Sequence, residues 1–185
     1  MAVPNDVTLK TFSGKYWMNK SLSGNTESVL SLQGIGFLTR KAIGLASVQL
    51  DINVYEAPPS PPNTSTDVVT HVDIVQTASG LSSTHENRTL DDTFREHSDW
   101  IFGTVSGKST WVKLEDIEDD FLREGWEDGT TDLIQSYVES KDNGWIATQI
   151  WGFQIIDGER RYSRNVLVTK DDQRVAIKLI YDYEA

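Results

Sequence analysis

Several arginine, tyrosine, histidine and acidic side chains in this sequence are of the types that perform acid–base chemistry or hold a polar group. The catalytic candidates are Tyr162, Tyr181, Arg164, His85 and Glu96. An enclosed arginine, two tyrosines and one carboxylate or histidine can bind a ligand oxygen and move protons if they converge on one cavity. Chemistry of this kind therefore requires a fold that brings these five side chains together.

Other common chemistries lack support in the sequence. The chain contains no cysteine, which removes thiol catalysis, disulfides and Cys-ligated zinc together. Its three histidines, His71, His85 and His97, do not follow the spacing of a metal motif. A Gly-x-Ser-x-Gly elbow for a serine nucleophile is also missing from the sequence. We therefore expect neither a metal nor a cofactor.

Length and charge narrow the class of protein further. The 185 residues fit one domain, 1–185, and a domain of this size buries roughly 70% of its unfolded surface without cross-links. The net charge of −11 argues against nucleic acid as a partner. The sequence has neither a signal-peptide pattern nor the roughly 20 apolar residues of a membrane span. We expect a cytoplasmic protein that binds a small molecule, and the oligomeric state stays open.

Short alternating segments rich in β-branched and aromatic residues fill most of the chain. We expect strands at residues 15–18, 47–55, 68–78, 81–90, 94–105, 109–113, 133–139, 145–156, 161–169 and 174–183. The turn signals between them are Ser79-Gly80, Asp91-Asp92, Ser106-Gly107, Asp157-Gly158 and Asp171-Asp172. About ten antiparallel strands in simple succession predict an all-β, up-and-down barrel.

Three segments depart from this strand pattern. Residues 56–67 hold four of the five prolines and predict an exposed loop. Residues 25–46 predict two short helices joined at Gly34 and Gly36, inserted after the first strand. Residues 113–126 carry apolar side chains at helical spacing on an acidic background, and predict one extra amphipathic helix outside the barrel or over an opening.

The helical segment also carries a resemblance to a known family. Residues Gly34 to Ala46 resemble the second helix of the intracellular fatty-acid-binding proteins, and Ser13-Gly14-Lys15-Tyr16 resembles the Gly-x-aromatic opening of that family and of lipocalins. The order of one strand, a helical pair and a long meander is similar to the plan of that family. The chain also resembles small lipocalin-like proteins of filamentous fungi. The specific match covers about the first fifty residues.

This resemblance implies a calycin barrel with a ligand cavity inside, entered past the helical pair. The family binds a carboxylate through an Arg-x-Tyr near the C-terminus and through another arginine a few strands earlier. Tyr181 and Phe153 stand nearest to those two arginine positions in this sequence. Both differences remove a charge, so the resemblance implies a bulkier and less charged ligand than a fatty acid. Arg164 would supply a displaced cation.

Strand parity predicts which side chains face the cavity, because residues i and i+2 share a face. With two-residue turns at Asp157-Gly158 and Asp171-Asp172, Trp151 lies opposite Arg164, and Tyr162 lies opposite both Phe153 and Tyr181. The predicted ligand-binding residues are Trp100, Phe102, Gln149, Trp151, Phe153, Tyr162, Arg164, Leu179 and Tyr181.

The same counting about Ser79-Gly80 pairs His71 with Arg88 and Asp73 with Glu86. This register places His85 on the cavity face, and its continuation through Asp91-Asp92 adds Glu96 to that face.

Two functions fit this cavity, and the sequence leaves the choice open. The first is non-covalent binding or transport of a small apolar molecule of the lipid, terpenoid or polyketide class. The alternative is a cofactor-independent cyclase or isomerase that acts on a hydrophobic natural-product intermediate. A carrier needs one anchor, whereas proton-transfer catalysis needs a donor and an acceptor that face each other across the ligand. An interaction module with a filled core and the acidic helix as its contact surface is a third possibility.

Overall fold

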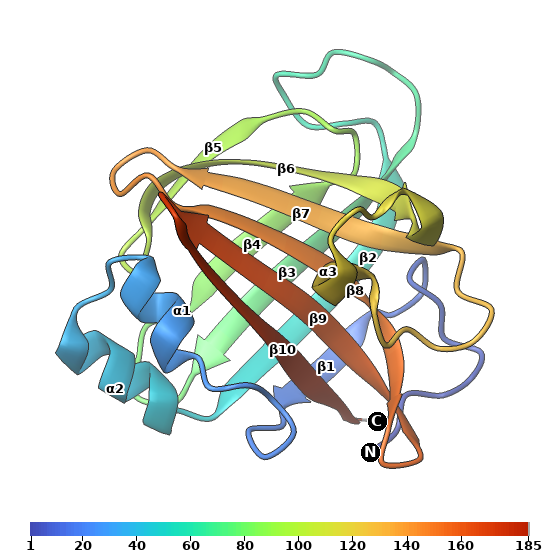
Figure 1. Cartoon of the computed structure of the whole chain (residues 1–185). Coiled ribbons are helices and arrows are strands. Elements are labelled where there is room, and N and C mark those ends of the chain that lie inside the picture. Colours follow the sequence, from blue (N-terminus) through green and yellow to red (C-terminus); the bar gives the residue numbers. More distant parts are fainter. Residues whose placement is uncertain (185) are drawn as a thin grey trace.

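Ten antiparallel strands form the body of the molecule in a computed structural model that describes residues 1–184 (Figure 1). The strands are β1 Gly14–Met18, β2 Val48–Ala57, β3 Val69–Ala78, β4 Thr84–Thr89, β5 Arg95–Asp99, β6 Gly103–Lys113, β7 Asp132–Ser140, β8 Ile146–Ile156, β9 Glu159–Lys170 and β10 Gln173–Glu184. Their order in the sheet is β4-β3-β2-β1-β10-β9-β8-β7-β6-β5. Because the last strand pairs with the first, the meander curls into the predicted all-β barrel.

The barrel is not hydrogen-bonded all the way round. β4 pairs with β3, and β5 pairs with β6, but no ladder joins β4 to β5 within residues 1–184. An isolated bridge between Leu90 and Ser109 links the end of β4 directly to β6. The hairpin predicted at Asp91-Asp92 is therefore wrong, because Leu90 and Asp92 pair with Ser109 of β6 there, and the wall keeps a gap between β4 and β5.

The C-terminal hairpins have the predicted register. Trp151 lies opposite Arg164, and Tyr162 lies opposite Phe153 on one side and Tyr181 on the other. The turn between β8 and β9 has positive φ at both Asp157 (51°) and Gly158 (78°), as in the two-residue turns that match the twist of paired strands. These residues therefore share the inner face.

The hairpin between β3 and β4 is displaced by one residue from its predicted register. Ile74 lies opposite Glu86 and Val72 opposite Arg88, because the connection between the strands is a five-residue loop (79–83) and not a two-residue turn. A shift of one residue exchanges the two faces of a strand. Glu86 and Arg88 therefore face the interior, and His85 faces outward.

The predicted turn at Ser106-Gly107 is also wrong, because β6 runs straight through it. A Cβ on Gly107 would lie 3.4 Å from Nη1 of Arg88 and 3.2 Å from Cγ2 of Val138. This glycine therefore permits a close approach of side chains to the strand. The turn lies instead at residues 100–102, between β5 and β6.

The predicted helical pair is present as α1 Glu27–Leu32 and α2 Phe37–Leu45. Val29 and Leu32 of α1 pack among inward-facing side chains of the barrel, including Val166 and Ile177. α1 thus closes one end of the barrel, and α2 lies outside it without a buried residue (Figure 1).

The acidic segment forms two short pieces in place of the single predicted helix. A 3-10 turn, Leu114–Asp116, is followed by α3, Asp120–Arg123. The Asp119 carboxylate accepts a hydrogen bond from the backbone N–H of Leu122 and so begins α3 anew. The Asn165 side-chain amide on the outer face of β9 donates to the carbonyls of Phe121 and Glu124, which fixes this segment outside the barrel (Figure 1).

An aromatic cluster fills the end of the barrel away from α1. The ring centroids of Phe12 and Tyr16 each lie 5.3 Å from that of Tyr162, which lies 5.4 Å from that of Tyr181. All four side chains are almost completely buried. The free space inside the barrel must therefore lie nearer to the end that α1 closes.

No helix in residues 1–184 has the length and apolar character needed to cross a membrane.

Candidate functional site

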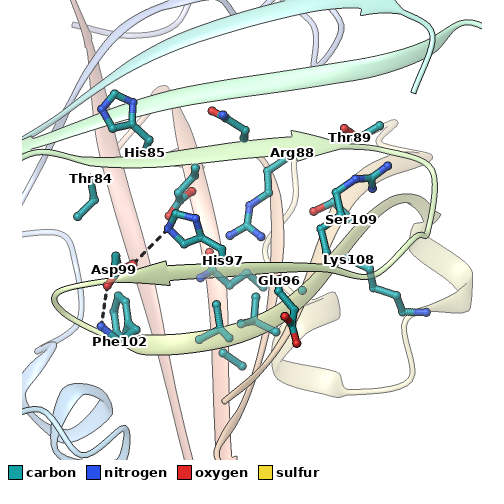
Figure 2. A pocket seen from close by; sticks show the side chains of 18 of the residues that line it. Thr84, His85, Arg88, Thr89, Glu96, His97, Asp99, Phe102, Lys108 and Ser109 are labelled. Carbon is teal, nitrogen blue, oxygen red and sulfur yellow. Dashed lines mark hydrogen bonds and ion pairs between the residues drawn. The ribbon is translucent and has the colours of Figure 1, made fainter. Parts of the chain in front are cut away.

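A cavity of about 340 Å³ lies behind the gap between β4 and β5. Side chains from both strands line it, together with residues of β6, β7 and β8 (Figure 2). Its apolar wall consists of Phe102, Val105, Val138, Trp145 and Ala147. Gln33 lines the cavity from the helical pair. The cavity therefore borders the gap in the wall as well as the helical end of the barrel.

Two charged side chains of β4 form the polar wall. Glu86 and Arg88 alternate with His85 and Asn87 along the strand, and Figure 2 shows Arg88 on the opposite side of β4 from His85. The Glu86 side chain keeps 25% of its surface accessible and lines the cavity. Burial would raise the pKa of Glu86, but Arg164 and Arg88 outweigh burial and hold the pKa below its usual range. Glu86 is therefore a carboxylate at neutral pH.

Arg164 of β9 lies behind this carboxylate and is almost fully buried. Its Nε donates to the Tyr162 hydroxyl at 3.0 Å, its Nη1 lies 3.4 Å from Oε2 of Glu86, and its guanidinium lies 4.1 Å from the centre of a Trp151 ring. Burial alone would lower the pKa of Arg164, but Tyr162 and Glu86 raise it above its ordinary value. Arg164 is thus a permanent cation that holds Glu86 in place.

Arg88 has a different environment. Its guanidinium makes no hydrogen bond or ion pair with any residue in 1–184, and its Nε is buried without a partner. The guanidinium lies 6.0 Å from the centre of the Trp151 ring. Burial lowers the pKa of Arg88, and Glu86 opposes this effect. Because arginine stays protonated in proteins, Arg88 is a charged donor that faces the cavity without a protein acceptor.

Polar groups from other strands complete the lining. His97 of β5 faces the cavity, with its Nε2 3.6 Å from Oδ2 of Asp99 (Figure 2). Gln149 of β8 lines the cavity and accepts a hydrogen bond from Nε1 of Trp151 at 2.9 Å. Trp151 therefore connects the polar lining to the buried aromatic cluster.

The structure brings only some of the predicted site residues to the cavity. Phe102 and Gln149 line it, whereas Trp151, Phe153, Tyr162 and Tyr181 belong to the packed core. Leu179 is partly buried against the core. Among the catalytic candidates, only Arg164 and its hydrogen-bond partner Tyr162 adjoin the charged wall through Glu86.

Three predicted residues lie differently because of the changes in register and turns. The side chains of His85 and Glu96 are exposed on the outer faces of β4 and β5, at the rim of the cavity. Figure 2 shows Glu96 and His97 on opposite sides of β5. Trp100 is 49% exposed in the turn between β5 and β6. Trp100 therefore does not line the cavity.

Sequence reasoning missed Glu86, Arg88 and His97. One signal for β4 was available, because Leu90 shares its parity with Glu86 and Arg88 and is an apolar residue at the end of an otherwise polar strand. Leu90 is buried. An inward orientation of Leu90 places Glu86 and Arg88 inside as well.

Among residues 1–184, no cluster of three or more His, Cys, Asp or Glu side chains has the geometry to hold a metal ion.

The fold is similar to those of a solved fatty-acid-binding protein and a solved fluorescent protein. A crystal structure of fatty-acid-binding protein 1 of Echinococcus granulosus aligns with a TM-score of 0.55 at 14% identity, over 94% of this chain and 98% of that chain. The fluorescent protein UnaG aligns with a TM-score of 0.56 at 14% identity, over 94% of this chain and 97% of that chain. At such identities the likeness shows the fold, and it confirms the expected calycin barrel.

Sequence relatives extend over the whole chain. No protein-family model matches it. A probable pericyclase of Mollisia scopiformis, scpY, is 30% identical over 184 residues, which cover 98% of this chain and 94% of the relative. The pericyclase pydY of an Acremonium species is 27% identical over 185 residues, which cover 99% of this chain and 97% of the relative. The chain therefore belongs to the family of these pericyclases.

Proposed function

We propose that this protein is a pericyclase, which closes a ring in an unsaturated, largely apolar natural-product intermediate held in the cavity behind β4 and β5. The observation that carries this proposal is the 30% identity to a probable pericyclase over 98% of the chain. The cavity supports it, because about 340 Å³ lies within the range of small-molecule sites, roughly 300–1,000 Å³.

A pericyclic reaction does not require proton transfer to or from the protein. Bonds form and break together around a ring of substrate atoms, and the electrons balance within the substrate. The requirement for a proton donor and an acceptor across the ligand therefore does not apply. The main obstacle is that a flexible chain rarely adopts the folded shape in which its reacting atoms meet.

The cavity is suited to select that folded shape. Phe102, Trp145 and Val138 form an apolar wall from three different segments, and the Glu86–Arg164 pair lies on a different side of the space. Holding the reacting ends about 3–3.5 Å apart can supply several kcal/mol of the barrier, on the order of 7–11 in favourable cases. Because Arg164 is fixed by Tyr162 and Trp151, the charges nearby need no reorganisation during the reaction.

Conversion of a precursor tests this function directly. The gene is deleted in its source organism, and the purified protein, dialysed against EDTA, is added to an extract of the deletion strain. We expect a precursor to disappear and a product of identical mass with fewer double bonds to appear, because ring closure is an isomerisation. Liquid chromatography with mass spectrometry and NMR follows both species. A precursor that stays unchanged in the presence of folded protein contradicts the proposal.

A matched pair of variants ties this conversion to the cavity. Ala147 lines the cavity and Thr148 lies on the other face of the same strand. Ala147→Leu intrudes on the substrate, and we expect a loss of roughly 10-fold to 100-fold in rate, since a displacement of about 1 Å can cost that much. Thr148→Leu should keep the rate of the parent protein. Equal rates in both variants would place the reaction elsewhere.

A carrier of the same kind of molecule is the second candidate. One observation favours it: Arg88 is a single cation that faces the cavity without a protein partner, and a carrier needs only one anchor. In the extract experiment, a carrier would bind the precursor in stoichiometric amount, as native mass spectrometry detects, without converting it. The same experiment therefore separates the two functions.

A further inference from the structure

The cations around the cavity differ in whether the protein neutralises them. Arg95 binds Asp91 at 2.8 Å, and Lys108 lies 2.8 Å from Asp92. In the same way, Arg164 is neutralised by Glu86, whose Oε2 lies 3.4 Å from Nη1 of the arginine. Arg88 is the exception among these four cations, because no carboxylate in residues 1–184 lies within ion-pair distance of its guanidinium.

An unpaired charge inside a barrel is costly, because removal from water is compensated only by ion pairs or hydrogen bonds. Three charged side chains meet on the inner wall, namely Glu86, Arg88 and Arg164. Their sum is one positive charge, since Arg164 already balances Glu86. This group of three side chains therefore lacks one negative charge, and Asp99, another carboxylate of the cavity lining, lies instead beside His97 at 3.6 Å.

The position of Arg88 leaves part of its guanidinium open to the cavity. On one side the guanidinium packs against Gly107 of β6, where even a Cβ would lie only 3.4 Å from Nη1. The arginine also lines the cavity. Its planar fork of N–H donors fits two oxygens that share one negative charge.

We propose that Arg88 is an anion-binding site, and that the ligand of this cavity is a monoanion with an apolar body. Its charged group, a carboxylate or a comparable pair of oxygens that share one charge, pairs with Arg88 on β4, and its body lies along the wall of Phe102, Val138 and Trp145. This position is distinct from the C-terminal carboxylate site implied by the family resemblance, where Tyr181 and Phe153 carry no charge. The anion site stands without turnover, and only its description as a substrate site rests on the proposed pericyclase function.

Two fluorescent probes test the charge preference. 1-Anilinonaphthalene-8-sulfonate carries one negative charge, and N-phenyl-1-naphthylamine is the same chromophore without the sulfonate. We expect the protein to bind the anionic probe at least tenfold more tightly. Arg88→Met should lose roughly 10-fold to 100-fold in affinity for the anion, the effect of a charge-assisted hydrogen bond of about 1.5–3 kcal/mol, and should bind the neutral probe about as before.

Two control variants and a folding check complete the experiment. Lys108→Met removes the same charge from a cation at the rim that Asp92 already neutralises, and it should keep the preference for the anion. Arg88→Lys keeps the charge but not the planar fork, and it should keep a weaker preference. Thermal melting followed by circular dichroism verifies that each variant is folded.

Equal binding of the two probes by the parent protein, or an unchanged preference in Arg88→Met, would overturn the anion site. Should Arg88→Met fail to fold, the comparison of the parent protein with Arg88→Lys decides in its place, and identical probe affinities in these two proteins count against the site. Because the probes are not converted, a confirmed preference together with an unconverted precursor would refute the pericyclase function and retain the anion site.

Discussion

Arg164 and Arg88 are both arginines of the inner wall, yet their contacts assign them different roles. Arg164 contacts Tyr162, Glu86 and Trp151, and only 3% of its side-chain surface is accessible. Arg88 has charged N–H groups without a partner in residues 1–184. Arg164 is therefore a positioning residue that holds Glu86, and Arg88 is the group that is free to meet a ligand.

Loss of Arg164 should be costly for stability. Arg164→Met removes the cation that lies 3.4 Å from Glu86. The loss of stability should be below the roughly 3–5 kcal/mol of a fully buried pair, because Glu86 keeps 25% of its surface accessible and Arg88 still attracts it. Addition of Glu86→Gln removes the carboxylate that has lost this partner and should restore part of the loss. Urea unfolding at pH 7 of the parent, the two single variants and the double variant measures the coupling. Additive losses would show that the pair does not act as a unit.

At the scale of elements, the proline-rich loop is tied to the segment that follows β4. Arg95 donates from Nη2 to the carbonyl of Ser60 at 2.6 Å and from Nε to that of Pro61 at 3.0 Å. Its guanidinium also binds both carboxylate oxygens of Asp91 at 2.8 Å, and Asn63 of the loop donates to the same carboxylate. Asp91 is therefore the common acceptor that joins the loop, the β4–β5 connection and β5.

This role of Asp91 predicts a pH-dependent stability. Hydrogen bonds from Arg95 and Asn63 lower the pKa of Asp91 from 3.8 to about 2 despite its burial. A depressed folded-state pKa stabilises the protein above pH 3.8, and the contribution is lost as pH falls from about 4 to about 2. Asp91→Asn should therefore cost about 2 kcal/mol at pH 7.

Denaturant unfolding at several pH values tests this prediction. The difference in unfolding free energy between the parent protein and Asp91→Asn should shrink between pH 4 and pH 2. Asp6→Asn serves as a control, because Asp6 lies in an exposed turn. A difference that stays constant with pH would mean that Asp91 acts through shape and not through its charge.

The elements also show which parts of the fold local sequence can predict. The β8–β9 and β9–β10 hairpins were predicted to the residue, because Asp157-Gly158 and Asp171-Asp172 define short turns and apolar alternation identifies one face. β4 and β5 contain only polar residues, so alternation cannot show which face is buried. The charged wall of the cavity lies on β4, and for this reason it was missed, whereas Gln149 and Phe102 were expected to face the cavity and do line it.

For the molecule as a whole, the gap in the wall should produce uneven local stability. β4 and β5 have a ladder on one side only, whereas β8 and β9 have one on both sides. Amide hydrogens of β4 and β5 should therefore exchange earlier than those of β8 and β9, since exchange requires only local opening. Hydrogen exchange followed by mass spectrometry of peptides measures this order. Equal protection of the four strands would show that side chains alone seal the gap.

The polar composition of the two gap strands has a consequence for how the protein behaves in a crowded solution. An unpaired strand edge is a template on which a second copy can add a strand, and charged side chains are the usual protection against such growth. β4 reads Thr-His-Glu-Asn-Arg-Thr and β5 reads Arg-Glu-His-Ser-Asp. The charges at the opening therefore discourage polymerisation as well as lining a binding site, and evolution toward a more apolar pocket along these strands would have to avoid creating a seed for aggregation.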